Sequence, residues 1–283
     1  MKVIVYATKE CQYYSALQDS CKKFNYDLIT LGLGNKWNGM GDKILGVYDY
    51  LQKLKDKKEI VLVVDAYDVI VCRDSKDIIE EFNKLEEDKV IFNAESLSSS
   101  FIKNYNWKRF YSGKKIGSGK YDKLNAGAMI GKVINIIKLF KKIIYKEKLR
   151  TLKIKSDQQV LYRMVNDKII GFNEINIDSQ CKIFTAISNL NDDLIMKNNK
   201  PYNKNTKTFP FVIHGPGGNT SLDHIIKKIN INSSFTKSKL KHNLSYYFAN
   251  FLDLIILISI LLFIFLIYKL TIYYRSKSKL ETF

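Results

Sequence analysis

Two carboxylates three residues apart, Asp65 and Asp68, follow directly after an apolar run at residues 60–64. An unbroken apolar run of this length is typical of a strand that is covered on both faces of a parallel sheet. Because the carboxyl ends of such strands line the ligand crevice, both side chains are expected beside a bound ligand. Close carboxylates repel each other unless a cation joins them, and Mg²⁺ or Mn²⁺ would share its oxygen ligands with substrate phosphates. In the alternative, Asp65 caps a turn and Asp68 is solvated.

A histidine, His214, ends another strand-like run at residues 208–214. Since strand ends in one parallel sheet can meet on one edge, Asp65, Asp68 and His214 are expected to share one metal ion. Mn²⁺ binds imidazole together with carboxylate ligands more readily than Mg²⁺ does, so Mn²⁺ is the expected cofactor. The glycines of the following turn would leave room for a diphosphate; they are Gly215, Gly217 and Gly218. A purely structural His214 is the alternative.

Asp157 and Asn125 are candidate catalytic residues. Asp157 stands at the start of an expected helix, where it could act as a base or orient an acceptor hydroxyl. The alternative is a capping role at the positive end of that helix. Asn125 supplies both a donor and an acceptor, and Gly127 lets the backbone pass close to a ligand. A site of tight packing between a helix and a strand is the alternative for this segment.

The elements that must position these side chains alternate between strands and helices. Strands are expected at residues 1–8, 26–30, 60–64, 90–95 and 208–214, and helices at 9–24, 43–54, 77–86, 133–146 and 158–165. This alternation predicts an α/β domain with a mostly parallel sheet. A strand, loop and helix at the start of the chain are typical of nucleotide binding.

The nucleotide is expected to contact the loop after the first strand. The residues of this turn are Tyr6, Ala7 and Thr8. Four glycines at residues 32–41 could bring backbone close to phosphates, although glycines this common usually indicate turns alone. Lys43 opens the next helix, where its charge could neutralise a departing diphosphate.

Composition narrows the class of function. The chain has 283 residues, is 46% hydrophobic and carries a net charge of +18, mostly from lysines spread along its length. No arginine-rich patch with interleaved aromatic residues is present, so nucleic acid is not an expected partner. A positive field favours anionic donors or anionic lipid surfaces. The four cysteines show no metal-binding or C-x-x-C spacing and are expected to be ordinary thiols.

A nearly apolar segment at residues 246–270 predicts a transmembrane helix. We therefore expect a domain at 1–230, a basic linker at 231–245, the helix and a basic tail at 271–283. A buried hairpin is the weaker alternative. Basic residues flank both sides, so orientation stays open. Without an N-terminal signal, a C-terminal anchor with a cytosolic domain is the simplest expectation; exposure to the ER or Golgi lumen would make three sequons usable, at Asn219, Asn232 and Asn243.

Several ordered segments resemble one family, the glycosyltransferase domain of the procollagen lysyl hydroxylases, and more loosely the collagen galactosyltransferases. The matching segments are 6–8, 31–37, Lys43, 64–70, 92–96, 124–127, 157–158, 182–184 and 212–215, within a match from about residue 2 to 225. The resemblance implies a GT-A fold and Mn²⁺ held by Asp65, Asp68 and His214. It also implies a UDP-sugar contacted by Tyr6, Ala7, Thr8, Tyr67 and the turn after His214, and sugar transfer to a hydroxyl.

The chain departs from the family mainly on the acceptor side. Ser156 stands where the family has an aspartate, and residues 97–100 replace a Trp-Pro pair. The sequence at 217–220 also lacks the lysine that the family carries after the His-Gly turn. No His-x-Asp motif is present, and three histidines leave none for an iron triad, so lysine hydroxylation is not expected.

These features together predict a membrane-anchored, Mn²⁺-dependent glycosyltransferase. Its expected donor is UDP-glucose or UDP-galactose, and its expected acceptor is a protein hydroxyl such as hydroxylysine in a collagen-like chain. The alternative from another class is an inactive, membrane-anchored module that binds UDP-sugar. A nucleotidyl or phosphoryl transferase is disfavoured because no Walker-type loop is present.

Overall fold

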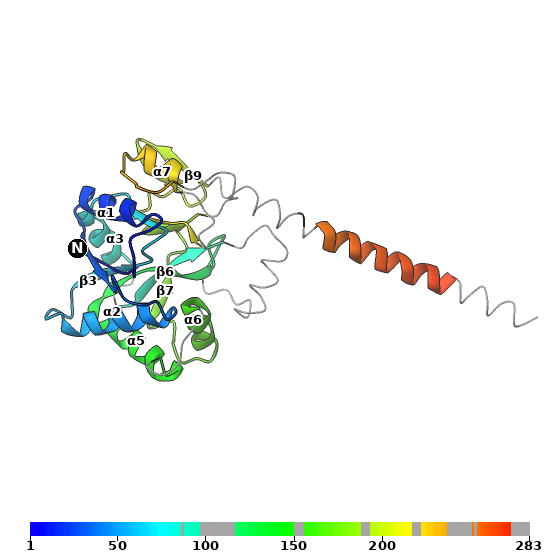
Figure 1. Cartoon of the computed structure of the whole chain (residues 1–283), viewed down its shortest axis with the longest axis horizontal. Helices are drawn as coiled ribbons and strands as arrows, with labels where there is room; N and C mark the ends of the chain where they lie inside the picture. The colour runs from blue at the N-terminus through cyan, green and yellow to red at the C-terminus, as the bar shows by residue number, and fades with distance from the viewer. Residues whose placement is uncertain are drawn as a thin grey trace, which may run out of the picture.

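The computed structural model describes residues 1–85, 88–96, 117–149, 156–187, 193–216, 222–236, 251 and 254–272. The altered acceptor segment 97–100 and two of the expected ligand-contacting glycines, Gly217 and Gly218, lie outside these residues. The described part contains the alternating strands and helices of an α/β domain (Figure 1). Its helices are α1 (Tyr14–Lys23), α2 (Gly41–Lys53), α3 (Ser75–Asn83), α5 (Val133–Glu147), α6 (Asp157–Asn166) and α7 (Asp223–Lys228).

The main sheet has six strands in the order β2-β1-β3-β6-β5-β7. They are β1 (Lys2–Tyr6), β2 (Asp27–Leu31), β3 (Ile60–Val64), β5 (Val90–Glu95), β6 (Lys123–Lys132) and β7 (Ile175–Ile177). β1 pairs in parallel with β2 and β3, and β5 pairs in parallel with β7, whereas β6 runs antiparallel to both of its neighbours. The sheet is therefore mixed, with one reversed strand in an otherwise parallel arrangement.

The central strand β3 shows why its sequence is apolar without a break. Val61 and Val63 face a core that contains residues of α2 and α5, whereas Leu62 and Val64 face a second core with residues of α1 and α3. Successive side chains of a strand point to opposite faces, so both faces of β3 are buried. Figure 1 shows α2 and α5 on one side of the sheet and α1 and α3 on the other.

A second sheet packs beside the first, with the strand order β4-β11-β8. Its strands are β4 (Val69–Val71), β8 (Phe184–Ala186) and β11 (Val212–His214). β11 pairs antiparallel with β4 and parallel with β8. A separate antiparallel hairpin is formed by β9 (Leu194–Lys197) and β10 (Lys200–Asn203). The strand expected at 208–214 thus forms over Val212–His214 alone, and it lies in the second sheet.

The segment 123–131, for which the sequence had suggested only close packing or ligand contact, forms the reversed strand β6. Its pairing with β5 shifts abruptly: Phe92 lies opposite Met129, but the next residue, Asn93, lies opposite Asn125. Ala128 nevertheless stays paired with Val64 of β3. Such irregularities redirect backbone and side chains and are frequent beside active sites. Here the shift carries residues 126–127 away from β5, towards the end of β3.

The folded domain continues past the boundary at residue 230 that the sequence suggested. Ile231 is buried in a third apolar cluster with residues of α7, and the Phe235 ring packs edge-on against Tyr13, with 5.0 Å between ring centroids. Leu254–Ile272 forms a helix that is long and apolar enough to cross a membrane, by length and composition. None of its apolar window is buried, and Figure 1 shows it as a separate orange helix.

Candidate active site

The turn between β3 and β4 carries both candidate carboxylates from one sheet to the other. Asp65 follows the last residue of β3, in the main sheet, and Asp68 precedes the first residue of β4, in the second sheet. His214 ends β11, opposite Val69, and the N–H of Gly215 donates to the Asp68 carbonyl at 2.8 Å. The expectation that these residues meet along one edge of a parallel sheet is therefore wrong. They meet because an antiparallel pair in the second sheet places the end of β11 beside the start of β4.

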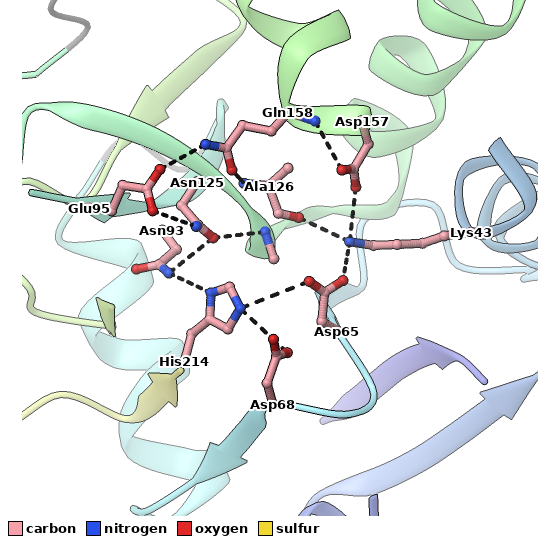
Figure 2. Close-up of polar contacts among 11 residues, drawn as sticks. Lys43, Asp65, Asp68, Asn93, Glu95, Asn125, Ala126, Asp157, Gln158 and His214 are labelled. Atoms are coloured by element: carbon pink, nitrogen blue, oxygen red, sulfur yellow. Dashed lines mark hydrogen bonds and ion pairs between the residues drawn. The ribbon is translucent and has the colours of Figure 1, made fainter. Parts of the chain in front are cut away.

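Asp65, Asp68 and His214 each present a ligand atom to a common point, and these atoms all lie within 4.8 Å of one another (Figure 2). His214 Nε2 is 3.4 Å from Asp68 Oδ1 and 3.9 Å from Asp65 Oδ2. Both His214 Nε2 and Asp68 Oδ1 are buried, and neither has a hydrogen-bond partner among the described residues. Buried polar atoms normally have a partner, and one divalent ion at about 2.0 to 2.6 Å from each atom would supply it. The donor set therefore fits a divalent cation.

The electrostatics of this cluster also favour a cation. Burial lowers the pKa of His214, but the nearby Asp68 and Asp65 carboxylates outweigh burial and leave this pKa raised. The pKa of Asp65 is raised chiefly by burial; Lys43 opposes that effect, and the Asp68 carboxylate adds to it. Both shifts reflect negative charge gathered at one point, which a divalent ion would stabilise.

Lys43 lies on the other side of Asp65, where it is almost fully buried. Its Nζ is 2.6 Å from Asp65 Oδ1 and 3.3 Å from Asp157 Oδ2, and it donates to the Ala126 carbonyl at 3.0 Å. Burial lowers the pKa of Lys43, but the two carboxylates more than compensate and leave it raised. The ammonium therefore balances two carboxylates of the site; neutralisation of a diphosphate by Lys43 stays a prediction.

Asp157 lies at the start of α6, but it is not the residue that caps the helix. The N-cap is Ser156, whose Oγ accepts a hydrogen bond from the N–H of Gln159 at 3.2 Å. This leaves Asp157 Oδ2 directed at Lys43 (Figure 2). Asp157 Oδ1 also accepts from the N–H of Gln158 at 2.9 Å, so Asp157 shares the structural role at the start of the helix with Ser156. The catalytic role of Asp157 stays a prediction.

A network of amides and one carboxylate links α6 to the cation cluster (Figure 2). Gln158 Nε2 donates to Glu95 Oε1 at 2.7 Å, and Asn125 Nδ2 donates to Glu95 Oε2 at 3.0 Å. Asn125 Oδ1 accepts from the N–H of Gly127 at 2.9 Å. Burial raises the pKa of Glu95, although its bonds to Asn125 and Gln158 act to lower it. Both ends of the Asn125 side chain are thus hydrogen-bonded to neighbouring residues, and its catalytic role stays a prediction.

The expected nucleotide contacts lie on loops after β1 and β3. Tyr67 Oη accepts from the N–H of Thr8 at 3.1 Å and donates to the Lys9 carbonyl at 3.0 Å. Ala7 is buried and extends β1 through a bond from its N–H to the Leu31 carbonyl. The Tyr67 hydroxyl thereby joins the two loops. Contact of Tyr67 with a UDP-sugar was implied by the family resemblance alone and stays a prediction.

Tyr6 packs its ring between two glycines. A Cβ added to Gly32 would lie 2.5 Å from Tyr6 Cζ, and one added to Gly46 would lie 2.7 Å from Tyr6 Cδ2. The Trp37 ring is tilted against Tyr6 with 6.1 Å between centroids. Tyr6 therefore fixes the glycine-rich loop against α2, and contact with nucleotide stays a prediction for it.

Comparison with known sequences identifies the family. The family model described as PLOD GT domain matches residues 1–238. The chain belongs to this family. The resemblance to the glycosyltransferase domain of the procollagen lysyl hydroxylases is thus confirmed.

Relatives of the chain include a Caenorhabditis elegans multifunctional procollagen lysine hydroxylase and glycosyltransferase, 28% identical over 77% of the chain and 30% of the relative. The human multifunctional procollagen lysine hydroxylase and glycosyltransferase LH3 is 28% identical over 76% of the chain and 29% of the relative. The chain thus spans less than a third of their length. A solved structure of galactosyltransferase LgtC with donor and acceptor sugar analogs aligns with 84% of the chain and 98% of its own length, at 13% identity and a TM-score of 0.45.

Three polar residues of the PLOD GT domain site were not assigned a role from sequence: Asn93, Glu95 and Gln158. Asn93 and Glu95 stand at alternate positions of β5, where apolar residues otherwise predominate. Residues two apart in a strand share a face, so this alternation was a usable signal. Gln158 follows Asp157, and its Oε1 accepts from the N–H of Ala126 at 3.2 Å. Nothing in the local sequence indicated that β6 would bring these residues together.

Proposed function

We propose that this chain is a Mn²⁺-dependent glycosyltransferase of GT-A type that transfers glucose or galactose from a UDP-sugar to a hydroxyl acceptor. The observation that carries the proposal is the cluster of Asp65, Asp68 and His214. Two of its buried ligand atoms have no hydrogen-bond partner within the described part of the chain. Membership of a glycosyltransferase-type family supplies the class of reaction.

Asp65, Asp68 and His214 would hold the ion and place the donor beside the loops after β1 and β3. A bound Mn²⁺ would offset the charge that develops on departing UDP. Tyr67 holds the backbone of Thr8 and Lys9, so the loop that would contact the nucleotide is already held in place. Gly215, which is bonded to the Asp68 backbone, begins the turn expected to face the diphosphate.

The acceptor would approach from the side of α6. Asp157 would accept the proton of the acceptor hydroxyl or orient it, a role that requires only hydrogen-bond reach. The Lys43 ammonium offsets the negative charges of Asp157 and Asp65 and holds both side chains in position. Glu95, which accepts hydrogen bonds from Asn125 and Gln158 on the same side, would be a second carboxylate near the acceptor. Hydroxylysine in a collagen-like peptide is the first acceptor to test.

The proposal is tested by a donor screen that measures released UDP, with Mn²⁺ and with EDTA. We expect UDP-glucose or UDP-galactose to give Mn²⁺-dependent release that rises with a hydroxylysine peptide. UDP binding without turnover on any acceptor would instead support the inactive UDP-sugar-binding module. An absence of Mn²⁺-dependent binding and release with both donors would contradict the enzyme.

Ligand variants test the metal site directly. Titration of UDP with Mn²⁺ into Asp65→Ala, Asp68→Ala and His214→Ala proteins should show that metal and UDP binding weaken together, because each holds the other in place. Asp68→Ala is the cleanest of the three, since Asp65 also pairs with Lys43. Wild-type affinity in all three folded variants would end the metal-site proposal.

We also propose that Leu254–Ile272 anchors the domain to a membrane as a single C-terminal pass. Because Phe235 packs on the domain, a truncation after residue 236 keeps the described core intact. This truncated protein should be soluble without detergent, whereas the full chain should require detergent or lipid. Detergent-free solubility of the full chain would contradict the anchor.

A further inference from the structure

Gly127 touches the ring of His214. A Cβ built on Gly127 would lie 2.1 Å from His214 Cε1 and 2.7 Å from both ring nitrogens. Real Cβ atoms do not approach other atoms so closely, and close packing of buried side chains leaves a displaced ring little room. The position therefore requires glycine because the imidazole occupies the space of a side chain.

The same glycine also holds the backbone of Asp65. Its carbonyl accepts the N–H of Asp65 at 2.7 Å, and its own N–H donates to Asn125 Oδ1 at 2.9 Å. The register shift between β5 and β6 places Gly127 at this point. One backbone unit thus fixes Asp65 through a hydrogen bond and His214 through contact.

Asn93 contacts the ring nitrogen on the opposite side from the carboxylates. It is fully buried, and its Nδ2 lies 3.2 Å from His214 Nδ1 and donates to Asn125 Oδ1 at 3.4 Å. Its Oδ1 is buried and has no hydrogen-bond partner within the described residues. A carboxamide can present either its oxygen or its nitrogen from the same position. Turning the oxygen towards Nδ1–H gives up the long hydrogen bond to Asn125 Oδ1. The ring would then direct the lone pair of Nε2 at Asp65 and Asp68, the tautomer that a metal ligand requires.

We propose that Gly127 and Asn93 are positioning residues for His214: Gly127 provides the space for the ring, and Asn93 sets its tautomer by accepting the proton of Nδ1. This inference rests on the proposed metal site. Residues of β5 and β6, in the main sheet, would thus orient His214, a metal ligand that belongs to the second sheet.

The first test compares two glycines of the same strand, Gly127→Ala and Gly131→Ala, in the full chain in detergent micelles. A Cβ on Gly131 would meet its nearest atom, Val90 Cγ2, at 3.4 Å, so this variant is a matched control. Mn²⁺ affinity is measured from the electron paramagnetic resonance signal of free Mn²⁺. We expect affinity to fall about 10- to 100-fold in Gly127→Ala, the range for loss of a residue that orients a ligand, and to stay unchanged in Gly131→Ala.

The second test separates the tautomer from packing and applies even if Gly127→Ala does not fold. Asn93→Asp can only accept a hydrogen bond from Nδ1–H, whereas Asn93→Leu has similar volume and no hydrogen-bonding atom. We expect Asn93→Asp to retain Mn²⁺ binding and Asn93→Leu to weaken it about tenfold or more. Nitrogen NMR of ¹⁵N-histidine in protein loaded with diamagnetic Zn²⁺ should show a protonated Nδ1 for His214 in the wild type, with the signal assigned by its loss in His214→Ala.

The outcomes distinguish this inference from the proposed function. Mn²⁺ binding by the wild type together with undiminished binding in Gly127→Ala and Asn93→Leu would overturn the positioning roles and leave the enzyme proposal standing. An unprotonated Nδ1 in the Zn²⁺-loaded wild type would overturn the role of Asn93. Failure of the wild type itself to bind Mn²⁺ would overturn both proposals.

Discussion

The two halves of the site differ in how completely their polar atoms are paired. On the α6 side, Glu95 accepts hydrogen bonds from Asn125 and Gln158, and Lys43 meets three acceptors. On the cation side, His214 Nε2 and Asp68 Oδ1 are buried without a hydrogen-bond partner within the described residues. Both halves are built from the same kinds of side chain, but among these described residues the cation side is the one whose ligand atoms lack a hydrogen-bond partner.

This difference indicates which half of the site holds the geometry and which half binds a ligand. A satisfied buried network rigidifies its surroundings, whereas an unsatisfied buried atom carries a desolvation cost that an external ligand can offset. We therefore infer that the α6 half holds the geometry and that the cation half receives the ligand. Lys43 and Asp65 connect the two halves, because Asp65 belongs to both the ion pair and the cation cluster.

The largest expected effect comes from removing the connecting cation. Lys43→Met would leave Asp65 and Asp157 uncompensated beside each other, and breaking a buried pair by removing one partner costs about 3 kcal/mol at the low end of the usual range. The low end applies because Asp65 keeps partial exposure. Thermal unfolding should show a clear decrease in Tm, and the double variant Lys43→Met/Asp157→Asn should recover part of it. An unchanged Tm would mean that Lys43 does not connect the halves.

A second substitution tests whether the α6 side does more than support. Asp157→Asn should reduce sugar transfer about 100-fold, the loss expected for a general base, while UDP binding changes little. Ser156→Ala is the control from the same helix end: loss of the cap should lower stability by about 1 kcal/mol and leave transfer intact. Equal transfer rates in wild type and Asp157→Asn would return Asp157 to a structural role.

The smallest expected effect is a dependence of Mn²⁺ binding on pH. Because Asp68 and Asp65 outweigh burial and raise the pKa of His214 above 6.5, the ring is charged below that pKa and competes with a cation. Mn²⁺ affinity should therefore increase as pH rises from about 6 to 8, by at most about tenfold per pH unit. Without metal the sign is opposite: the stability contributed by charged His214 is full below its unfolded pKa and is lost as pH rises through the folded pKa.

The measurement is Tm against pH in Mn²⁺ and in EDTA. The two curves should diverge as pH rises, and in His214→Ala the divergence should disappear. Parallel curves for the wild type would show that protonation of His214 does not compete with the cation.

Local patterns in the sequence predicted the helices of the described domain other than α7 and the strands β1, β2, β3, β5 and β11. The remaining strands, including the long β6, were not expected. The apolar run before Asp65 predicted a strand buried on both faces, and β3 is covered by a core on each side. The residues that form the cation cluster, Asp65, Asp68 and His214, could be chosen from their chemistry and their places at strand ends. The family was also evident from short ordered segments, and the family match confirmed it.

Only the tertiary structure decided how these residues meet. No local pattern indicated that β6 runs antiparallel to its neighbours or that His214 belongs to a second sheet, because strand pairing depends on contacts far apart in the chain. The shift at Asn93 and the packing of Gly127 against His214 likewise depend on that pairing. Local propensity specifies where a strand forms, whereas pairing and burial across the whole domain select its direction and register, and with them the partners of every polar side chain in the site.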